Sequence, residues 1–228
     1  MPETCILYYI TDRMSFPGDE SVRRSRLLAK ISEAARAGVD YVQLREKDLL
    51  TRDLESLARQ AVAAIETVKT ENPEIRTALL INSRTDVALA VRSDGVHLRC
   101  NDISPQEVRA IWEKCGAGAN AREASPTPLL IGVSCHSQEE VIRAACGGAT
   151  FAVFASVFEK KNAPNTPAKG LQSLKKACEA EIPVLALGGI TLPNARSCLD
   201  AGAAGIAAIR LFQDNDINKV VQRLRTES

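Results

Sequence analysis

The chain has 228 residues, of which 45% are hydrophobic, and its formal net charge is +1. This balance supports one sizeable core and gives no global indication of a nucleic-acid or membrane partner. No run approaches the roughly 20 apolar residues that a membrane-spanning helix needs. The seven cysteines are scattered without a Cys-x-x-Cys pair, and the first residues lack a signal-peptide pattern. We therefore expect reduced thiols and a cytoplasmic location.

Short apolar runs alternate with amphipathic stretches along the whole chain. The apolar runs predict strands at 6–11, 41–45, 78–82, 95–98, 129–134, 151–155, 183–187 and 205–209. The amphipathic stretches predict helices at 21–37, 51–68, 84–91, 105–114, 137–146, 171–179, 194–201 and 216–223. Ser104 can cap its helix, with Pro105 at the first helical position. The pattern is eight consecutive strand–helix units.

Repeated strand–helix units indicate a parallel sheet, because each crossover between parallel strands needs a helix. Eight units in this length favour an α/β fold, a closed (β/α)8 TIM barrel, with residues 1–228 forming one domain. A doubly wound open sheet is the alternative. That fold usually has a Gly-rich turn after its first strand, where this chain has Thr11-Asp12-Arg13. Two long loops, at 116–128 and 159–170, separate neighbouring units.

The stretch 41–47, Tyr-Val-Gln-Leu-Arg-Glu-Lys, alternates with the period of a strand. Val42 and Leu44 can pack outward against helices, which leaves Gln43, Arg45 and Lys47 together on the opposite face. One interpretation is a sheet edge whose polar face is wet. The other is an interior lined by two cations and an amide, which suits an anion such as phosphate.

In a barrel the chemistry lies at the carboxyl ends of the strands. Polar or glycine residues end or follow many of the predicted strands: Thr11, Asp12, Asn82, Ser83, His97, Asp102, Ser134, His136, Lys160, Asn162, Gly188, Gly189 and, after Ile209, Arg210. The two glycines can bring backbone N–H groups close to a phosphate, a frequent use of the last two loops of this fold. Each feature is weak alone, but together they predict an anion site on one rim.

Several segments carry a resemblance to a known family. They are Tyr9-Ile-Thr-Asp12, Val42-Gln-Leu-Arg-Glu-Lys-Asp48, Leu80-Ile-Asn82 with Asp86-Val-Ala-Leu-Ala-Val91, Asp94-Gly-Val-His-Leu98, Ile131-Gly-Val-Ser134 with His136, and Leu187-Gly-Gly-Ile190. In this order they are a specific combination, and the chain resembles thiamine phosphate synthase along nearly its whole length. The resemblance implies a (β/α)8 barrel.

The resemblance also implies a reaction. In that family an aminopyrimidine methyl diphosphate loses pyrophosphate with the help of Mg²⁺, and a thiazole phosphate nitrogen captures the resulting cation. By this resemblance, Asp102 and Ser83 stand at metal positions, and Arg45, Lys47, Ser134 and His136 at catalytic ones. Substrate-binding positions are Gln43, Arg45, Lys47, Asn82, Ser134, Lys160, Asn162, Gly188, Gly189, Ile209 and Arg210. The partners are then small molecules, and the oligomeric state stays open.

The chain departs from the family pattern at several of these positions. Ser83 stands where the family has a metal-binding aspartate, and Lys160-Lys161-Asn162-Ala163 replaces a Thr-x-Thr-Lys run. Two alternatives therefore remain open. One is a thiazole tautomerase, a sister branch with the same barrel that uses a histidine at the position of His136 as acid–base. The other is a diverged phosphate-ligand binder without catalysis.

Overall fold

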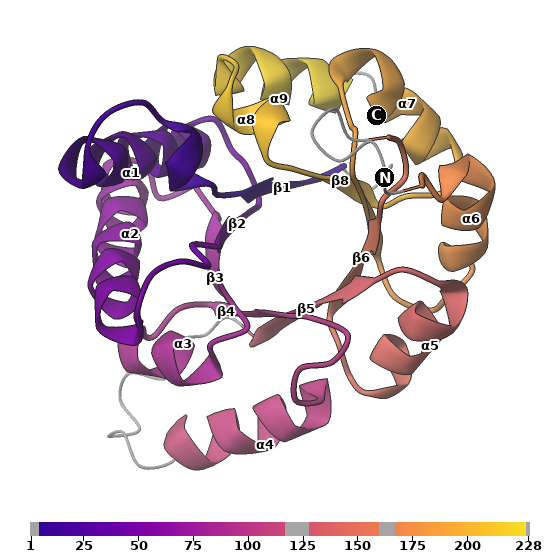
Figure 1. The fold of residues 1–228 in the computed structure, drawn as a ribbon, viewed down its shortest axis with the longest axis horizontal. Coiled ribbons are helices and arrows are strands. Elements are labelled where there is room, and N and C mark those ends of the chain that lie inside the picture. Colours follow the sequence, from indigo (N-terminus) through magenta and orange to yellow (C-terminus); the bar gives the residue numbers. More distant parts are fainter. Residues whose placement is uncertain (1–4, 117–127, 160–166, 227–228) are drawn as a thin grey trace.

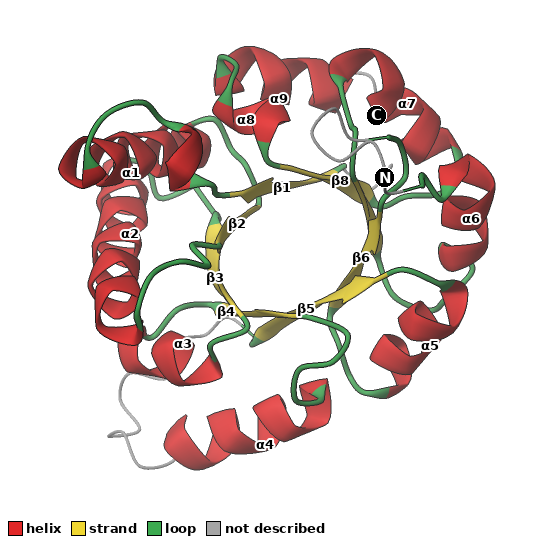
Figure 2. Ribbon diagram, in the orientation of Figure 1, coloured by secondary structure: helices red, strands yellow, loops and turns green. Residues whose placement is uncertain are grey.

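The computed structural model describes residues 5–116, 128–159 and 167–226. Eight parallel strands alternate with helices and form a ring that the helices surround (Figures 1 and 2). The strands are β1 (Ile6–Ile10), β2 (Tyr41–Leu44), β3 (Ala78–Asn82), β4 (Gly95–Leu98), β5 (Leu130–Cys135), β6 (Phe151–Ala155), β7 (Val184–Leu187) and β8 (Gly205–Ala208).

The barrel closes because β8 pairs with β1 in parallel, with Ile6 opposite Gly205 and Tyr9 opposite Ala208. The strand order is sequential from β1 to β8, and every neighbouring pair is hydrogen-bonded. The predicted TIM barrel is thus confirmed, and the open-sheet alternative is wrong. The wet-edge interpretation of β2 is also wrong, since this strand lies between β1 and β3 and Gln43 is only 1% exposed.

The helices that follow the strands are α1 (Glu20–Arg36), α2 (Thr51–Glu71), α3 (Thr85–Val91), α4 (Pro105–Gly116), α5 (Gln138–Cys146), α6 (Gly170–Ala177), α7 (Leu192–Asp200), α8 (Arg210–Gln213) and α9 (Ile217–Thr226). Local sequence sets where several begin. Asp19 accepts the Val22 N–H at the start of α1, and Ser104 accepts the Glu107 N–H at the start of α4, as predicted. In the part of the chain that the structure describes, no helix has the length and apolar character needed to cross a membrane.

Two apolar layers hold the fold together. Val42, Leu44 and many other outward strand residues pack against the surrounding helices, as the alternation of 41–47 predicts. Inside the barrel, Tyr8, Leu80, Phe151 and neighbouring side chains form a second, smaller cluster. This interior cluster leaves the carboxyl ends of the strands as the place where polar groups can gather.

Two short elements were not predicted from the sequence. A 3₁₀ turn, η1 (Arg13–Ser15), follows β1, and α8 precedes the last helix. In addition, β2 ends at Leu44, one residue before its predicted end, so Arg45 belongs to the loop that follows. These differences lie at the carboxyl rim, where Gln213 of α8 contacts Tyr9 and the backbone of Asp12.

Candidate active site

A cavity of about 1080 Å³ opens at the carboxyl ends of the strands. Its volume suits an organic ligand of substantial size. The predicted site residues that line it are Gln43, Arg45, Lys47, Asn82, Ser134, His136, Gly188, Gly189, Ile209 and Arg210. Among the described lining residues, four Lys or Arg side chains stand against two carboxylates, Glu159 and Asp214. This excess of positive charge favours an anion.

The backbone of Arg45 is held by a hydrogen bond, whereas its guanidinium is available to a ligand in the cavity. Its N–H donates to Thr11 Oγ1 at 3.0 Å, which ties the start of the β2–α2 loop to the end of β1. Within the described ranges its guanidinium makes no hydrogen bond or ion pair, and burial lowers its pKa. A half-buried cation without a direct partner is well suited to bind an incoming anion.

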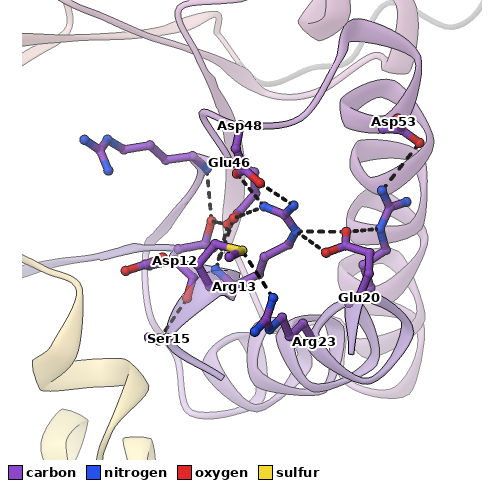
Figure 3. Close-up of polar contacts among 12 residues, drawn as sticks. Asp12, Arg13, Ser15, Glu20, Arg23, Glu46, Asp48 and Asp53 are labelled. Carbon is purple, nitrogen blue, oxygen red and sulfur yellow. Dashed lines mark hydrogen bonds and ion pairs between the residues drawn. The ribbon is translucent and has the colours of Figure 1, made fainter. Parts of the chain in front are cut away.

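An ion cluster centred on the buried Arg13 connects the segment after β1 with the β2–α2 loop and with α1 (Figure 3). The side chain of Arg13 is 3% exposed and binds Asp48 through two hydrogen bonds of 2.7 Å, Glu46 at 3.2 Å and Glu20 at 3.0 Å. Glu46 also accepts from Thr11 Oγ1 at 2.6 Å. Burial raises the pKa of Glu46, and the hydrogen bonds from Thr11 and Arg13 only partly offset this. Because Thr11 contacts both Glu46 and the Arg45 backbone, the cluster anchors this side of the rim.

Polar side chains continue from β2 across β3. Gln43 Nε2 donates to Asn82 Oδ1 at 3.0 Å, and Asn82 Nδ2 donates to Ser83 Oγ at 3.2 Å. Gln43 and Asn82 face the cavity, whereas Ser83 is not one of its lining residues. The amide of Asn82 is oriented by both contacts, because its oxygen accepts from one neighbour and its nitrogen donates to the other.

Asp102 contacts Ser83 and, like Ser83, is not one of the residues that line the cavity. Its carboxylate accepts from the Arg99 backbone N–H at 2.8 Å and from Arg99 Nη2 at 2.9 Å. Burial acts to raise the pKa of Asp102, but the hydrogen bonds from Arg99 and Ser83 outweigh it and hold that pKa below its usual value. An ionised carboxylate beside a hydroxyl is a hard-oxygen donor set. It fits Mg²⁺, which often takes one or two carboxylates and completes its shell with phosphate oxygens and water.

No cluster of three or more His, Cys, Asp or Glu side chains suited to a metal occurs among the described residues. Asp102 is thus the single carboxylate of this donor set, and it already carries a guanidinium partner. Lys160 and Asn162, the two predicted residues of the β6–α6 loop, lie outside the described residues.

The β5 end supplies two further polar groups. Ser134 Oγ lies 2.8 Å from His97 Nε2, and His136 Nδ1 lies 2.8 Å from the carbonyl oxygen of Ala155. A carbonyl can only accept, so His136 carries a proton on Nδ1 and, in its neutral form, has Nε2 as its accepting nitrogen. Both Ser134 and His136 line the cavity.

Gly188 and Gly189 follow β7 and form another part of the cavity wall, with φ values of 102° and 64°. A Cβ atom at Gly188 would lie 2.0 Å from Ser156 Oγ, and one at Gly189 would lie 2.5 Å from the carbonyl oxygen of Glu159. Only glycine satisfies both the backbone angle and the close approach. The turn therefore presents bare backbone to the cavity, which is the arrangement that phosphate-binding loops of this fold use.

The family model described as "Thiamine monophosphate synthase" matches residues 7–212. The chain belongs to the thiamine monophosphate synthase family. It is 35% identical to the thiamine-phosphate synthase of Pyrococcus furiosus over 221 residues, covering 96% of this chain and 92% of that protein. It is 33% identical to the thiamine-phosphate synthase of Clostridium acetobutylicum over 204 residues, covering 89% and 84%.

A solved structure supports the same family. Thiamine phosphate pyrophosphorylase from Pyrococcus furiosus superposes with a TM-score of 0.74 and 30% sequence identity, over 99% of this chain and 96% of that one.

The cavity is also lined by residues that the sequence pattern did not single out. Glu159, Asp214 and Asn215 all line it. Asp214 and Asn215 lie just after α8, so the unpredicted short helix explains why they were missed.

Proposed function

We propose that this chain is a thiamine phosphate synthase, which joins an aminopyrimidine methyl diphosphate to a thiazole phosphate and releases pyrophosphate. The observation that carries the proposal is the positively charged cavity of a full-length family barrel, lined by Gln43, Arg45 and Lys47 and by the Gly188-Gly189 turn. In the reaction, the carbon–oxygen bond to the diphosphate breaks and a carbon–nitrogen bond to the thiazole forms. The pyrophosphate leaves with the electron pair.

In this mechanism the protein needs no nucleophile. Arg45 and Lys47 neutralise the leaving diphosphate, and Gln43 with Asn82 orients the pyrimidine diphosphate. Ser134 contributes a hydroxyl to the same anion. The backbone of Gly188, Gly189, Ile209 and Arg210 binds the thiazole phosphate, while Lys160 and Asn162 belong to the substrate loop. Catalysis on these terms is charge stabilisation, positioning and exclusion of water.

Mg²⁺ is the proposed cofactor, with Asp102 as its carboxylate and Ser83 as a direct or water-mediated neighbour. When bound, the ion supplies additional positive charge to the diphosphate oxygens. Since Ser83 is a weaker ligand than a carboxylate, Arg45 and Lys47 would carry a larger share of the diphosphate charge in this chain. We further propose that residues 1–228 act as one domain. The seven free cysteines support a reducing, cytoplasmic location.

A direct assay tests the proposal. The purified protein is incubated with both phosphorylated heterocycles, with and without Mg²⁺, and thiamine phosphate is quantified together with released pyrophosphate. Product formation that depends on Mg²⁺ is the expected result. Bound phosphate ligands with no turnover would instead indicate the non-catalytic binder and would overturn the proposal.

The thiazole tautomerase remains a second candidate because of one observation. His136 is held by the Ala155 carbonyl through Nδ1, so its second nitrogen can exchange a proton with a ligand in the cavity. The discriminating measurement is isomerisation of a thiazole carboxylate phosphate. Isomerisation that His136→Ala abolishes, with no thiamine phosphate formed by the unmodified protein, would favour this second function over the first.

A further inference from the structure

A line of hydrogen bonds runs from the barrel interior to the cavity wall. Tyr8 Oη lies 3.1 Å from His97 Nδ1, and His97 Nε2 lies 2.8 Å from Ser134 Oγ. Tyr8 on β1 is 0% exposed and does not line the cavity, whereas His97 on β4, which is 3% exposed, and Ser134 on β5 both line it. The reaction described above gives no part to Tyr8 or His97. Their contact with a cavity-lining hydroxyl nevertheless connects them to the ligand.

The His97 ring is neutral. Burial, with a smaller contribution from the charge of Arg45, lowers the pKa of His97 to about 3. A neutral imidazole carries one N–H, so the line has two arrangements. In one, Tyr8 donates to Nδ1 and Nε2–H donates to Ser134. In the other, Nδ1–H donates to Tyr8, and the Ser134 hydroxyl donates to Nε2.

The surroundings of Tyr8 decide between the two arrangements. Tyr41 and Phe151 meet its ring edge-on, with centroid separations of 5.9 Å and 5.5 Å, inside the apolar interior cluster. Among the described residues, the Tyr8 hydroxyl has no hydrogen-bond partner except His97. If His97 donated to it, the Tyr8 hydrogen would be buried without an acceptor, which disfavours that arrangement by roughly tenfold or more. The first arrangement satisfies every group, because the Ser134 hydrogen can reach the open cavity.

We propose that Tyr8 and His97 are positioning residues that fix the Ser134 hydroxyl as a hydrogen-bond donor directed into the cavity, toward an oxygen of the diphosphate. The choice of this acceptor rests on the proposed function. Tyr8 donates to His97, His97 donates to Ser134, and Ser134 donates to the anion. A chain of donors with one direction polarises each member, and it ends on the negative charge that strengthens it.

The direction of the line excludes another role for Ser134. In a serine hydrolase the histidine is flanked by a carboxylate, which accepts from Nδ1 and leaves Nε2 free to take the serine proton. Here the third member is a buried phenol that must donate, so Nε2 already carries the hydrogen. Ser134 is therefore a donor to the ligand and not an activated nucleophile, despite its contact with a histidine.

Nitrogen NMR of the histidine rings tests the direction without any turnover. The chain has only two histidines, so ¹⁵N-histidine labelling gives two ring spectra, and a His136→Gln variant assigns them. We expect His97 at neutral pH to show a protonated Nε2 and an unprotonated, hydrogen-bonded Nδ1. A protonated Nδ1, or an imidazolium, would overturn the proposal. Since this measurement needs no substrate, its failure is distinct from an absence of synthase activity.

A double-mutant cycle tests the consequence for the ligand. Tyr8→Phe is expected to lower kcat/KM, and the affinity for inorganic pyrophosphate, by roughly fivefold. On a Ser134→Ala background the same change is expected to cost less than about twofold, because Tyr8 acts through Ser134. Equal effects on both backgrounds would contradict the proposal.

Tyr41→Phe is the matched control. It removes a phenol from the same aromatic cluster, in edge-on contact with Tyr8, but not from the hydrogen-bonded line. We expect it to leave the His97 ring signals unchanged, whereas Tyr8→Phe should remove their fixed tautomer. If Tyr8→Phe left the His97 tautomer fixed, the tyrosine would not be what sets it, and the proposal would be wrong.

Discussion

Replacing Arg13 by methionine is a direct test of how the rim is held. Arg13 is 3% exposed and joins three carboxylates, from Glu20, Glu46 and Asp48. Methionine keeps a long apolar side chain in place of the arginine stem but removes the charge and all five donors. The change therefore isolates the electrostatic part of the cluster from its packing.

The free-energy cost of losing the Arg13 guanidinium differs among the three carboxylates. Asp48 and Glu20 have side chains that are 53% and 44% exposed, so water can replace the guanidinium there at a cost of about 0–1 kcal/mol each. The Glu46 side chain is 2% exposed and would keep only the Thr11 hydroxyl and the Arg13 backbone N–H. Breaking a buried pair from one side costs about 3–5 kcal/mol. Because these two donors remain, we expect a loss near the lower limit, about 3 kcal/mol.

Urea denaturation at neutral pH measures the loss of unfolding free energy. Arg36→Met is the matched control, since Arg36 and Glu71 form an ion pair in which both side chains are 54% exposed. We expect this control to change stability by less than about 1 kcal/mol. If Arg13→Met were no more destabilising than Arg36→Met, the buried cluster would not be a significant source of stability and the argument would fail.

The pH dependence gives a second check on the same variant. Hydrogen bonds from Arg13 hold the pKa values of Asp48 and Glu20 below their usual range. A lowered carboxyl pKa contributes stability that is present above the unfolded value and lost as the pH falls through the folded one. Burial raises the pKa of Glu46, but the hydrogen bond and the charge of Arg13 act to lower it, so protonation of Glu46 also reduces what Arg13 contributes to stability. The stability difference between wild type and Arg13→Met should therefore shrink below about pH 4.

Three further predictions concern the cavity. Arg45→Ala should weaken binding of inorganic pyrophosphate, measured by calorimetry, by about 10-fold or more, because a charge-assisted contact is removed; unchanged affinity would refute its placement. Gly188→Ala should raise KM for the thiazole phosphate and destabilise the fold. The control is Gly38→Ala, because Gly38 has a positive φ but nothing within 4 Å of an added Cβ, and it should lower the free energy of unfolding by only about 1 kcal/mol. Equal losses of stability in the two variants would count against the close-approach argument. Asp102→Asn should raise the Mg²⁺ concentration for half-maximal activity about tenfold, and Arg99→Ala should lower it; an unchanged Mg²⁺ dependence in Asp102→Asn would place the metal elsewhere.

Local sequence was sufficient for the architecture and for part of the site. Eight apolar runs separated by amphipathic stretches allow few other folds, because parallel strands require helical crossovers. The alternation of 41–47 placed Gln43 on the interior face and Leu44 against the helices, since strand periodicity assigns faces without knowledge of partners. The paired glycines before Ile190 were recognisable for a similar reason. Their positive φ values are a local requirement, whereas the close approach of Ser156 to Gly188 is a tertiary contact.

The tertiary structure decided which groups meet. Arg13 is 33 residues from Glu46 and 35 from Asp48, and no local rule pairs a cation with carboxylates at that distance. The separation between Tyr8 and His97 is 89 residues. The barrel sets these partners, because the pairing of β1 with β2 brings the segments that follow them together, and the closed ring brings β1 and β4 around one interior. The direction of the Tyr8–His97–Ser134 line cannot be read from local sequence at all. It follows from the absence of a second acceptor for Tyr8 among the described side chains.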